Sequence, residues 1–269
     1  MESLINPTKQ LIAFLKDAHG VVDLSAMRFL HPIQLLPMAA IIIEESLKYK
    51  MPASSNCAGY LNHFNFPNGY TQFKSVSSNY IPIYKFQGVN GTKTEMCNKS
   101  DVLKNLMKIM LRDIGSPEGA INALELVVDE IVSNVGEHSG ARYGWINAQY
   151  YPKKKYLDVC ILDRGKTITG KYKEVGKIFS NDRDSLKSAL EGESSKPEKI
   201  RGSGLPTFVK MITKGFAGEM VVISGNAIAF ASKRKNPLVQ SITTRWGGTI
   251  VAFRIPNTQK PIDYTLYIE

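Results

Sequence analysis

The sequence predicts an α+β fold in two parts, with a boundary near residue 95. Two observations lead to this prediction. Residues 101–113 and about 117–138 carry apolar side chains at helical spacing, and short apolar runs typical of strands follow them. Helices and strands in separate runs are typical of α+β proteins. The length of 269 residues suits one large domain or two small ones.

The composition is that of an ordinary globular protein, which argues against wholesale disorder and fibrous repeats. The chain holds 34 Lys and Arg against 24 Asp and Glu, so its net charge is +10. A basic balance indicates an acidic partner: nucleic acid, a membrane surface or a phosphate ligand. Composition does not choose among these.

The cysteines and the N-terminal sequence indicate a soluble, cytoplasmic protein without membrane contact. Cys57, Cys97 and Cys160 lie far apart, and a sparse, odd number of cysteines does not suggest a secreted disulfide framework. The first ten residues lack the layout of a signal peptide. In the most apolar stretch, the uninterrupted run of residues 38–43 is far shorter than the ~20 residues of a membrane span.

The first part is expected to contain short elements. Residues 9–16 predict a helix, residues 21–24 a β-like run, and residues 32–48 a helix with a strongly apolar face. The aromatic residues of the segment 51–87 are expected to pack a small core, and the alternative is that they stack on bases.

A polar, glycine-containing linker is predicted at residues 86–100. The second of the two helices that follow it is preceded by Ser116 and Pro117, an N-cap followed by proline at the first helical position. The polar segment 166–199 is typical of a lid or a disordered connection. The candidate strands are residues 145–150, 156–162, 220–224, 227–231 and 249–255.

Three polar residues, Glu130, Asn134 and His138, recur at every fourth position of the second helix. Each step of four residues turns about 40° beyond a full turn, so these side chains form a stripe beside the apolar face. A solvated polar face is one interpretation of this stripe, and a functional site is the other.

Glycine-containing features later in the chain favour the functional interpretation. Asp163 and Gly165 follow a predicted strand, which places a carboxylate at a strand end. Gly202 and Gly204 directly precede a predicted helix, where backbone N–H groups can approach a phosphate. Thr249 follows two glycines at the start of the last predicted strand. Each feature alone is typical of an ordinary turn, and their order and spacing together are more specific.

With these residues, the sequence from about 101 to 257 resembles the GHKL ATPase superfamily, whose ATP-binding domain is the Bergerat fold. Histidine kinases, anti-sigma-factor serine kinases, type II topoisomerase ATPase domains and a heat-shock chaperone belong to it. The Glu…Asn…His pattern is most similar to the anti-sigma kinase branch, because histidine kinases tend to have Lys in the third place. The resemblance implies an α/β sandwich over residues 96–269, in which helices cover a mixed sheet.

The resemblance also implies a site for ATP and Mg²⁺. Asp163 would accept a hydrogen bond from the adenine amino group, with help from Thr249 through a shared water, and Gly165 would let the base lie close to the backbone. Asn134 would hold Mg²⁺ through its side-chain oxygen, a suitable hard ligand. Glu130 would act as the general base toward the attacking water or protein hydroxyl.

The remaining matches concern the phosphates. Gly202, Gly204 and Leu205 match the second glycine box and would cradle phosphate, and residues 166–199 would form the ATP lid. For His138, phosphate contact and a hydrogen bond at the helix end are equal alternatives.

The sequence departs from the family at several points. Thr167 stands where the first glycine box usually has a second glycine. Pro206 follows Leu205 just inside the phosphate helix, where an early helical position tolerates it. We expect neither a self-contained histidine kinase, because no phospho-acceptor helix precedes the ATP-binding part, nor a topoisomerase, because little chain follows Thr249.

Residues 21–43 resemble part of a STAS-like domain, in which a strand leads through a turn into a helix and the turn contacts a partner. This implies a STAS-like or partner-binding domain over residues 1–95. The first strands of a standard STAS domain are not evident, and the alternative is a small α/β domain with an ordinary apolar helix. A STAS-like part beside an anti-sigma-like ATPase implies partner switching within one chain.

Together these features predict an Mg²⁺-dependent ATP-binding protein with slow ATPase or serine/threonine kinase activity that regulates a protein partner. A homodimer is compatible with this function. One alternative is a non-catalytic, ATP-sensing regulatory module. Another is a nucleic-acid-binding ATPase that uses the basic clusters 153–155 and 233–235, for which solvated loop lysines are the favoured interpretation.

Overall fold

The computed structural model describes residues 3–17, 20–72, 79–87, 99–109, 117–193, 204–257 and 260–267. It contains both helices and sheets, which confirms the α+β class. The helices are α1 (Ile5–Asp17), α2 (Pro32–Glu44), α3 (Ser55–His63), α4 (Lys99–Ile109), α5 (Ala120–His138), α6 (Ile168–Glu174), α7 (Asp182–Leu190) and α8 (Leu205–Lys210), with the π-helical turn η2 (Met211–Gly215) and the 3-10 turn η3 (Tyr264–Tyr267). The strands are β1 (Val21–Asp23), β2 (Lys48–Lys50), β3 (Tyr80–Gln87), β4 (Tyr143–Tyr151), β5 (Tyr156–Asp163), β6 (Glu219–Ser232) and β7 (Lys235–Pro256).

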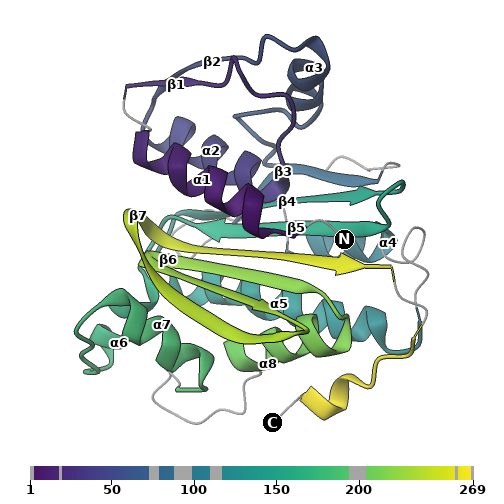
Figure 1. Ribbon diagram of the computed structural model, residues 1–269, viewed down its shortest axis with the longest axis vertical. Coiled ribbons are helices and arrows are strands. Elements are labelled where there is room, and N and C mark those ends of the chain that lie inside the picture. Colours follow the sequence, from purple (N-terminus) through teal and green to yellow (C-terminus); the bar gives the residue numbers. More distant parts are fainter. Residues whose placement is uncertain are drawn as a thin grey trace.

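The larger sheet has five strands in the order β3-β4-β5-β7-β6, and all its neighbouring strands run antiparallel (Figure 1). The mixed sheet implied by the family resemblance is therefore wrong for these strands. For the pairs β4–β5 and β6–β7 the connections give the physical reason, because a short turn joins each pair and a short turn can only reverse the chain. The parallel pair β1–β2 forms a separate sheet, bridged by α2.

Strand β3 lies before residue 95, yet it is the edge strand of the large sheet and pairs with β4. The sheet thus extends across the boundary that the sequence predicts near that residue. Most of the predicted linker, residues 88–98, lies outside the described part of the chain.

Helices cover both faces of the large sheet (Figure 1). Helices α1 and α2 lie on one face, and α4, α5 and α8 pack on the other. Strand β5 shows the consequence, because all its residues are buried. Its Val159 and Ile161 point into the core under α5, and its Cys160 and Leu162 point into the core under α2.

Several elements differ from their predicted bounds. Helix α5 begins at Ala120 after Gly119, whose positive φ of 76° ends the preceding turn, and not at Pro117. The two short strands predicted between residues 220 and 231 are one strand, β6. Strand β7 begins at Lys235, well before the predicted 249, because it pairs along almost the whole length of β6. Among the described residues, no helix combines the length and apolar character that crossing a bilayer requires.

The predicted lid is partly helical. Within the segment 166–199, residues 168–174 and 182–190 form α6 and α7, and residues 194–199 lie outside the described part. The side chains of Thr167 and Asn181 accept hydrogen bonds from the first turns of these helices, as N-caps do. Local caps therefore begin both helices, although the segment has little apolar periodicity.

Candidate functional site

Three polar residues lie side by side at one end of the sheet, on the face that α5 covers. Asp163 of β5 is paired with Thr249 of β7, and Thr249 is paired with Ser224 of β6. The residues two positions back along β5 and two positions on along β7, Ile161 and Val251, belong to the core under α5. Because side chains alternate along a strand, the three polar side chains point to the same face.

Hydrogen bonds hold this row in place. The Asp163 Oδ1 atom accepts a hydrogen bond of 2.8 Å from the Gly165 N–H. The Ser224 hydroxyl donates to the Gly248 carbonyl at 3.0 Å and lies 3.3 Å from the Thr249 hydroxyl. These hydrogen bonds therefore hold the three polar side chains of the row in a fixed arrangement at the end of the sheet.

Asp163 is the most perturbed of these groups. The residue is 4% exposed, and burial raises the pKa of its carboxyl to about 7, while the backbone N–H groups of Gly165 and Thr249 act in the opposite direction. Near neutral pH the carboxyl therefore populates both protonation states. A buried acceptor with such a pKa, at the end of a strand, is a candidate for ligand recognition.

Two glycines crowd against this carboxyl and its loop. At Gly165, a Cβ atom would lie 2.1 Å from the carbonyl oxygen of Ser139, just after α5. At Gly248, whose φ is 104°, a Cβ atom would lie 2.3 Å from the Asp163 carbonyl oxygen. The predicted glycine at position 165 is thus required by a contact with the protein's own backbone.

Helix α5 is joined to the loop after β5 at its C-terminal end. The Lys166 N–H donates a hydrogen bond of 2.7 Å to the Ser139 carbonyl. The helix that carries Glu130 and Asn134 therefore adjoins the Asp163 loop, and both side chains are half-buried. His138 is the last residue of α5, and its side chain lies outside the described part of the structure.

The predicted phosphate-binding turn is described only from Gly204 onward. Gly204 is the N-cap of α8 in an extended conformation, and Leu205 is the first helical residue. Pro206 occupies an early position of the helix, as the sequence predicts. Gly202 lies outside the described residues.

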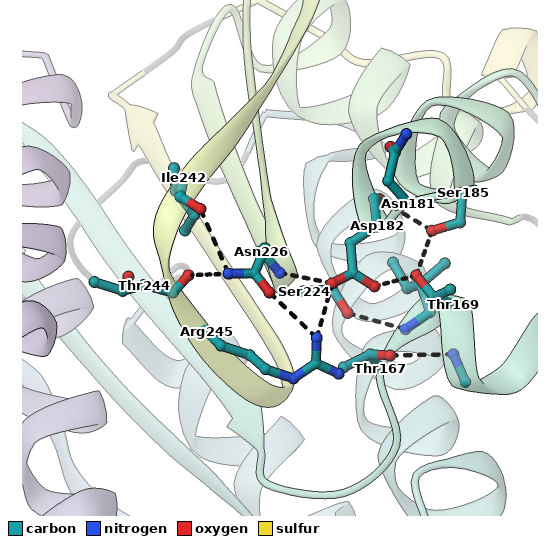
Figure 2. Close-up of polar contacts among 12 residues, drawn as sticks. Thr167, Thr169, Asn181, Asp182, Ser185, Ser224, Asn226, Ile242, Thr244 and Arg245 are labelled. Carbon is teal, nitrogen blue, oxygen red and sulfur yellow. Dashed lines mark hydrogen bonds and ion pairs between the residues drawn. The ribbon is translucent and has the colours of Figure 1, made fainter. Parts of the chain in front are cut away.

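A polar network that the sequence does not reveal anchors α6 and α7 on β6 and β7 (Figure 2). The Asp182 Oδ2 atom accepts hydrogen bonds from the Asn226 N–H at 2.8 Å and from Arg245 Nη1 at 3.0 Å. Its Oδ1 atom accepts from the Thr169 hydroxyl, which also lies 2.6 Å from the Ser185 hydroxyl. No sequence pattern distinguishes Asp182 from the other acidic residues of the segment.

Next to this network, a separate hydrogen bond joins the start of α6 to the polar row at Ser224. The Ile168 N–H, at the start of α6, donates a hydrogen bond of 2.9 Å to the Ser224 hydroxyl. Thr167 caps α6 by accepting a hydrogen bond from the Gly170 N–H at 3.1 Å, which explains threonine where the resembled family has glycine. The start of the predicted lid is therefore fixed beside Asp163.

The described residues contain no group of three or more His, Cys, Asp and Glu side chains that could hold a metal ion. Two of the oxygen-bearing side chains of α5, Glu130 and Asn134, are one turn apart. Mg²⁺ commonly takes one or two protein oxygens and completes its coordination with water and substrate phosphates. The residues present thus fit an ion carried by a phosphate ligand.

No protein-family model matches the chain, and no curated protein matches it in sequence.

Proposed function

We propose that the chain is a GHKL-type, Mg²⁺-dependent ATP-binding protein with slow ATPase or serine/threonine kinase activity toward a protein partner. The observation that carries the proposal is the buried Asp163 carboxyl, in register with Thr249 and beside the end of α5. This combination supports recognition of a base edge that carries an amino group.

The polar row of Asp163, Thr249 and Ser224 would recognise adenine. Ionised Asp163 would accept a hydrogen bond from the adenine amino group, and the Thr249 hydroxyl would assist through a shared water. Gly165 would let the base approach the loop. The buried position of Asp163 supports selectivity, because a base with an oxo group in place of the amino group leaves a buried acceptor unpaired.

Residues of α5 and of the start of α8 would bind the phosphates and their metal ion. Gly202 and Gly204 would offer backbone N–H groups at the start of α8. Asn134 would hold Mg²⁺, which when bound neutralises charge on the phosphates. Glu130 would take the proton from the attacking water or protein hydroxyl. The half-buried positions of Glu130 and Asn134 on α5 are compatible with these roles.

The N-terminal part would meet the protein partner through the turn between β1 and α2. This arrangement of strand, turn and helix is the one for which the STAS-like resemblance implies a partner contact. Phe29 in this turn is 45% exposed, which supports a contact surface there.

Calorimetry with Mg²⁺ and ATP tests the binding site. Wild-type protein is expected to bind ATP, and Asp163→Asn is expected to weaken binding at least about tenfold, because it removes a charged acceptor worth about 1.5–3 kcal/mol. Asp263→Asn, an equal change at an exposed position, serves as the control. No ATP binding by the wild type would contradict the function, and unchanged binding by Asp163→Asn would contradict the site.

Turnover assays with Glu130→Ala test the chemistry. Retained ATP binding with loss of turnover is the expected result for a general base. A wild type that binds ATP but never turns it over would favour the non-catalytic, ATP-sensing module.

A further inference from the structure

A second candidate site lies alongside α8 and its continuation η2. A cavity of about 330 Å³ opens between the end of α7, the helix α8–η2 and the turn that joins β6 to β7. Volumes of this size hold small ligands in proteins. The cavity reaches the first turn of α8 through Pro206, beside the proposed phosphate-binding turn. None of Asp163, Thr249 and Ser224 lines it, so the cavity is distinct from the polar row proposed to recognise adenine.

Four cationic side chains line the cavity, from two different elements. Lys210 and Lys214 come from α8–η2, four residues apart on the helix. Lys233 and Arg234 are the two residues of the β6–β7 turn. Among the described residues that line it, none is Asp or Glu. The cavity therefore concentrates positive charge.

The two cations of the β6–β7 turn lie in a tight hairpin turn between paired strand residues. Ser232 and Lys235 pair on either side of it, so Lys233 and Arg234 project from a closed hairpin end. In the described part of the chain, neither of them, nor Lys214, forms an ion pair with a carboxylate.

The remaining walls suit a compact molecule with both polar and apolar parts. Leu190, Val209 and Pro237 supply apolar surface, and Ser232 and Asn236 supply hydrogen-bonding groups. A nucleic-acid strand needs an extended basic track, whereas these cations converge on one cavity.

We propose that this cavity binds a compact, multiply charged phosphorylated small molecule. Lysine and arginine side chains form charge-assisted hydrogen bonds with phosphate oxygens, and convergence from two elements favours a ligand with at least two negative charges. This cavity accounts for part of the net positive charge of the chain, a part that the proposed nucleotide site does not use.

Isothermal titration calorimetry, in which inorganic pyrophosphate is titrated into the full chain, tests this site. The wild type is expected to bind pyrophosphate, and the double variant Lys233→Glu, Arg234→Glu is expected to weaken binding at least about tenfold. Lys214→Gln, on the helix side, should weaken it by a smaller factor. The control is Lys153→Glu, Lys154→Glu, which makes the same change of charge in the β4–β5 turn and should change the affinity less than about threefold.

Three results would overturn the inference. The first is no pyrophosphate binding by the wild type at millimolar concentration, and the second is an equal loss of pyrophosphate affinity in both double variants. The third is binding of a DNA or RNA duplex that requires Lys233 and Arg234, while pyrophosphate does not bind. Failure of the proposed ATP function is distinguishable. In that case ATP binding is absent or independent of Asp163, while pyrophosphate binding still depends on the β6–β7 turn.

Discussion

Asp158 of β5 and Arg254 of β7 face each other in register, and two hydrogen bonds of 2.5 and 2.6 Å join their side chains. Both residues are buried, and the Arg254 guanidinium lies 3.9 Å from the centre of the Tyr156 ring. His31, the N-cap of α2, places its Nδ1 atom 3.1 Å from the Asp158 carboxylate. The ion pair joins two strands of the sheet, and the contact of His31 with Asp158 ties α2 to them.

Removing one partner of this pair is expected to destabilise the fold strongly. Asp158→Asn should lower the free energy of unfolding by about 3–5 kcal/mol, because it leaves the Arg254 charge buried without compensation. Urea unfolding measures the change. Asp23→Asn, which breaks an exposed pair with Lys50, is the control and should change stability little. Similar losses in the two variants would contradict the structural role of the buried pair.

Asp163 should make the protein less stable as the pH rises. Its pKa of about 7 in the folded protein lies above the ordinary 3.8, so between these values the folded state keeps a proton that the unfolded state has lost. The free energy of unfolding should therefore fall from pH 5 to pH 8, by on the order of 2 kcal/mol from this group.

The variant Asp163→Asn isolates this effect, because it has no titrating group at that position. Its stability relative to the wild type should rise across the same pH range. Urea unfolding at pH 5, 6.5 and 8 measures both proteins, and identical pH profiles would show that the carboxyl does not titrate there.

Asp182 is expected to control the local stability of α6 and α7. Asp182→Ala removes the acceptor for Asn226 and Arg245, so amide hydrogen exchange in both helices should accelerate, and the free energy of unfolding should fall by about 1–3 kcal/mol. Asp184→Ala makes the same change two positions later in α7, where the half-buried carboxylate accepts hydrogen bonds only from Ser180 and Asn181 at the start of its own helix. Exchange that increases equally in both variants would contradict the anchoring role.

The neighbouring glycines 247 and 248 should respond differently to alanine. Gly248→Ala should cost at least about 2 kcal/mol, because its φ of 104° disfavours a side chain and the new Cβ atom would meet the Asp163 carbonyl. At Gly247 no atom lies within 4 Å of the added Cβ, so Gly247→Ala should change stability by far less. Thermal unfolding of the pair checks this, and equal melting temperatures would contradict the predicted crowding at Asp163.

Local patterns predicted much of the second part of the chain. The apolar spacing of α5 and the continuous apolar run of β5 depend on neighbouring residues, so both elements lie near their predicted positions. The extent of β7 and the place of β3 at the sheet edge were not predictable in this way. Both depend on pairing with strands distant in sequence, which leaves no local signal.

The candidate site divides in the same manner. The sequence alone determined that a carboxylate, Asp163, ends a buried strand and that Gly165 follows it, because strand and turn propensities act over a few residues. Only the tertiary structure aligned Asp163 with Thr249 and Ser224, fixed α6 and α7 through Asp182, and gathered Lys210 and Arg234 around one cavity. Strand register and helix packing bring together residues separated by tens of positions, and it is their shared burial that raises the pKa of Asp163.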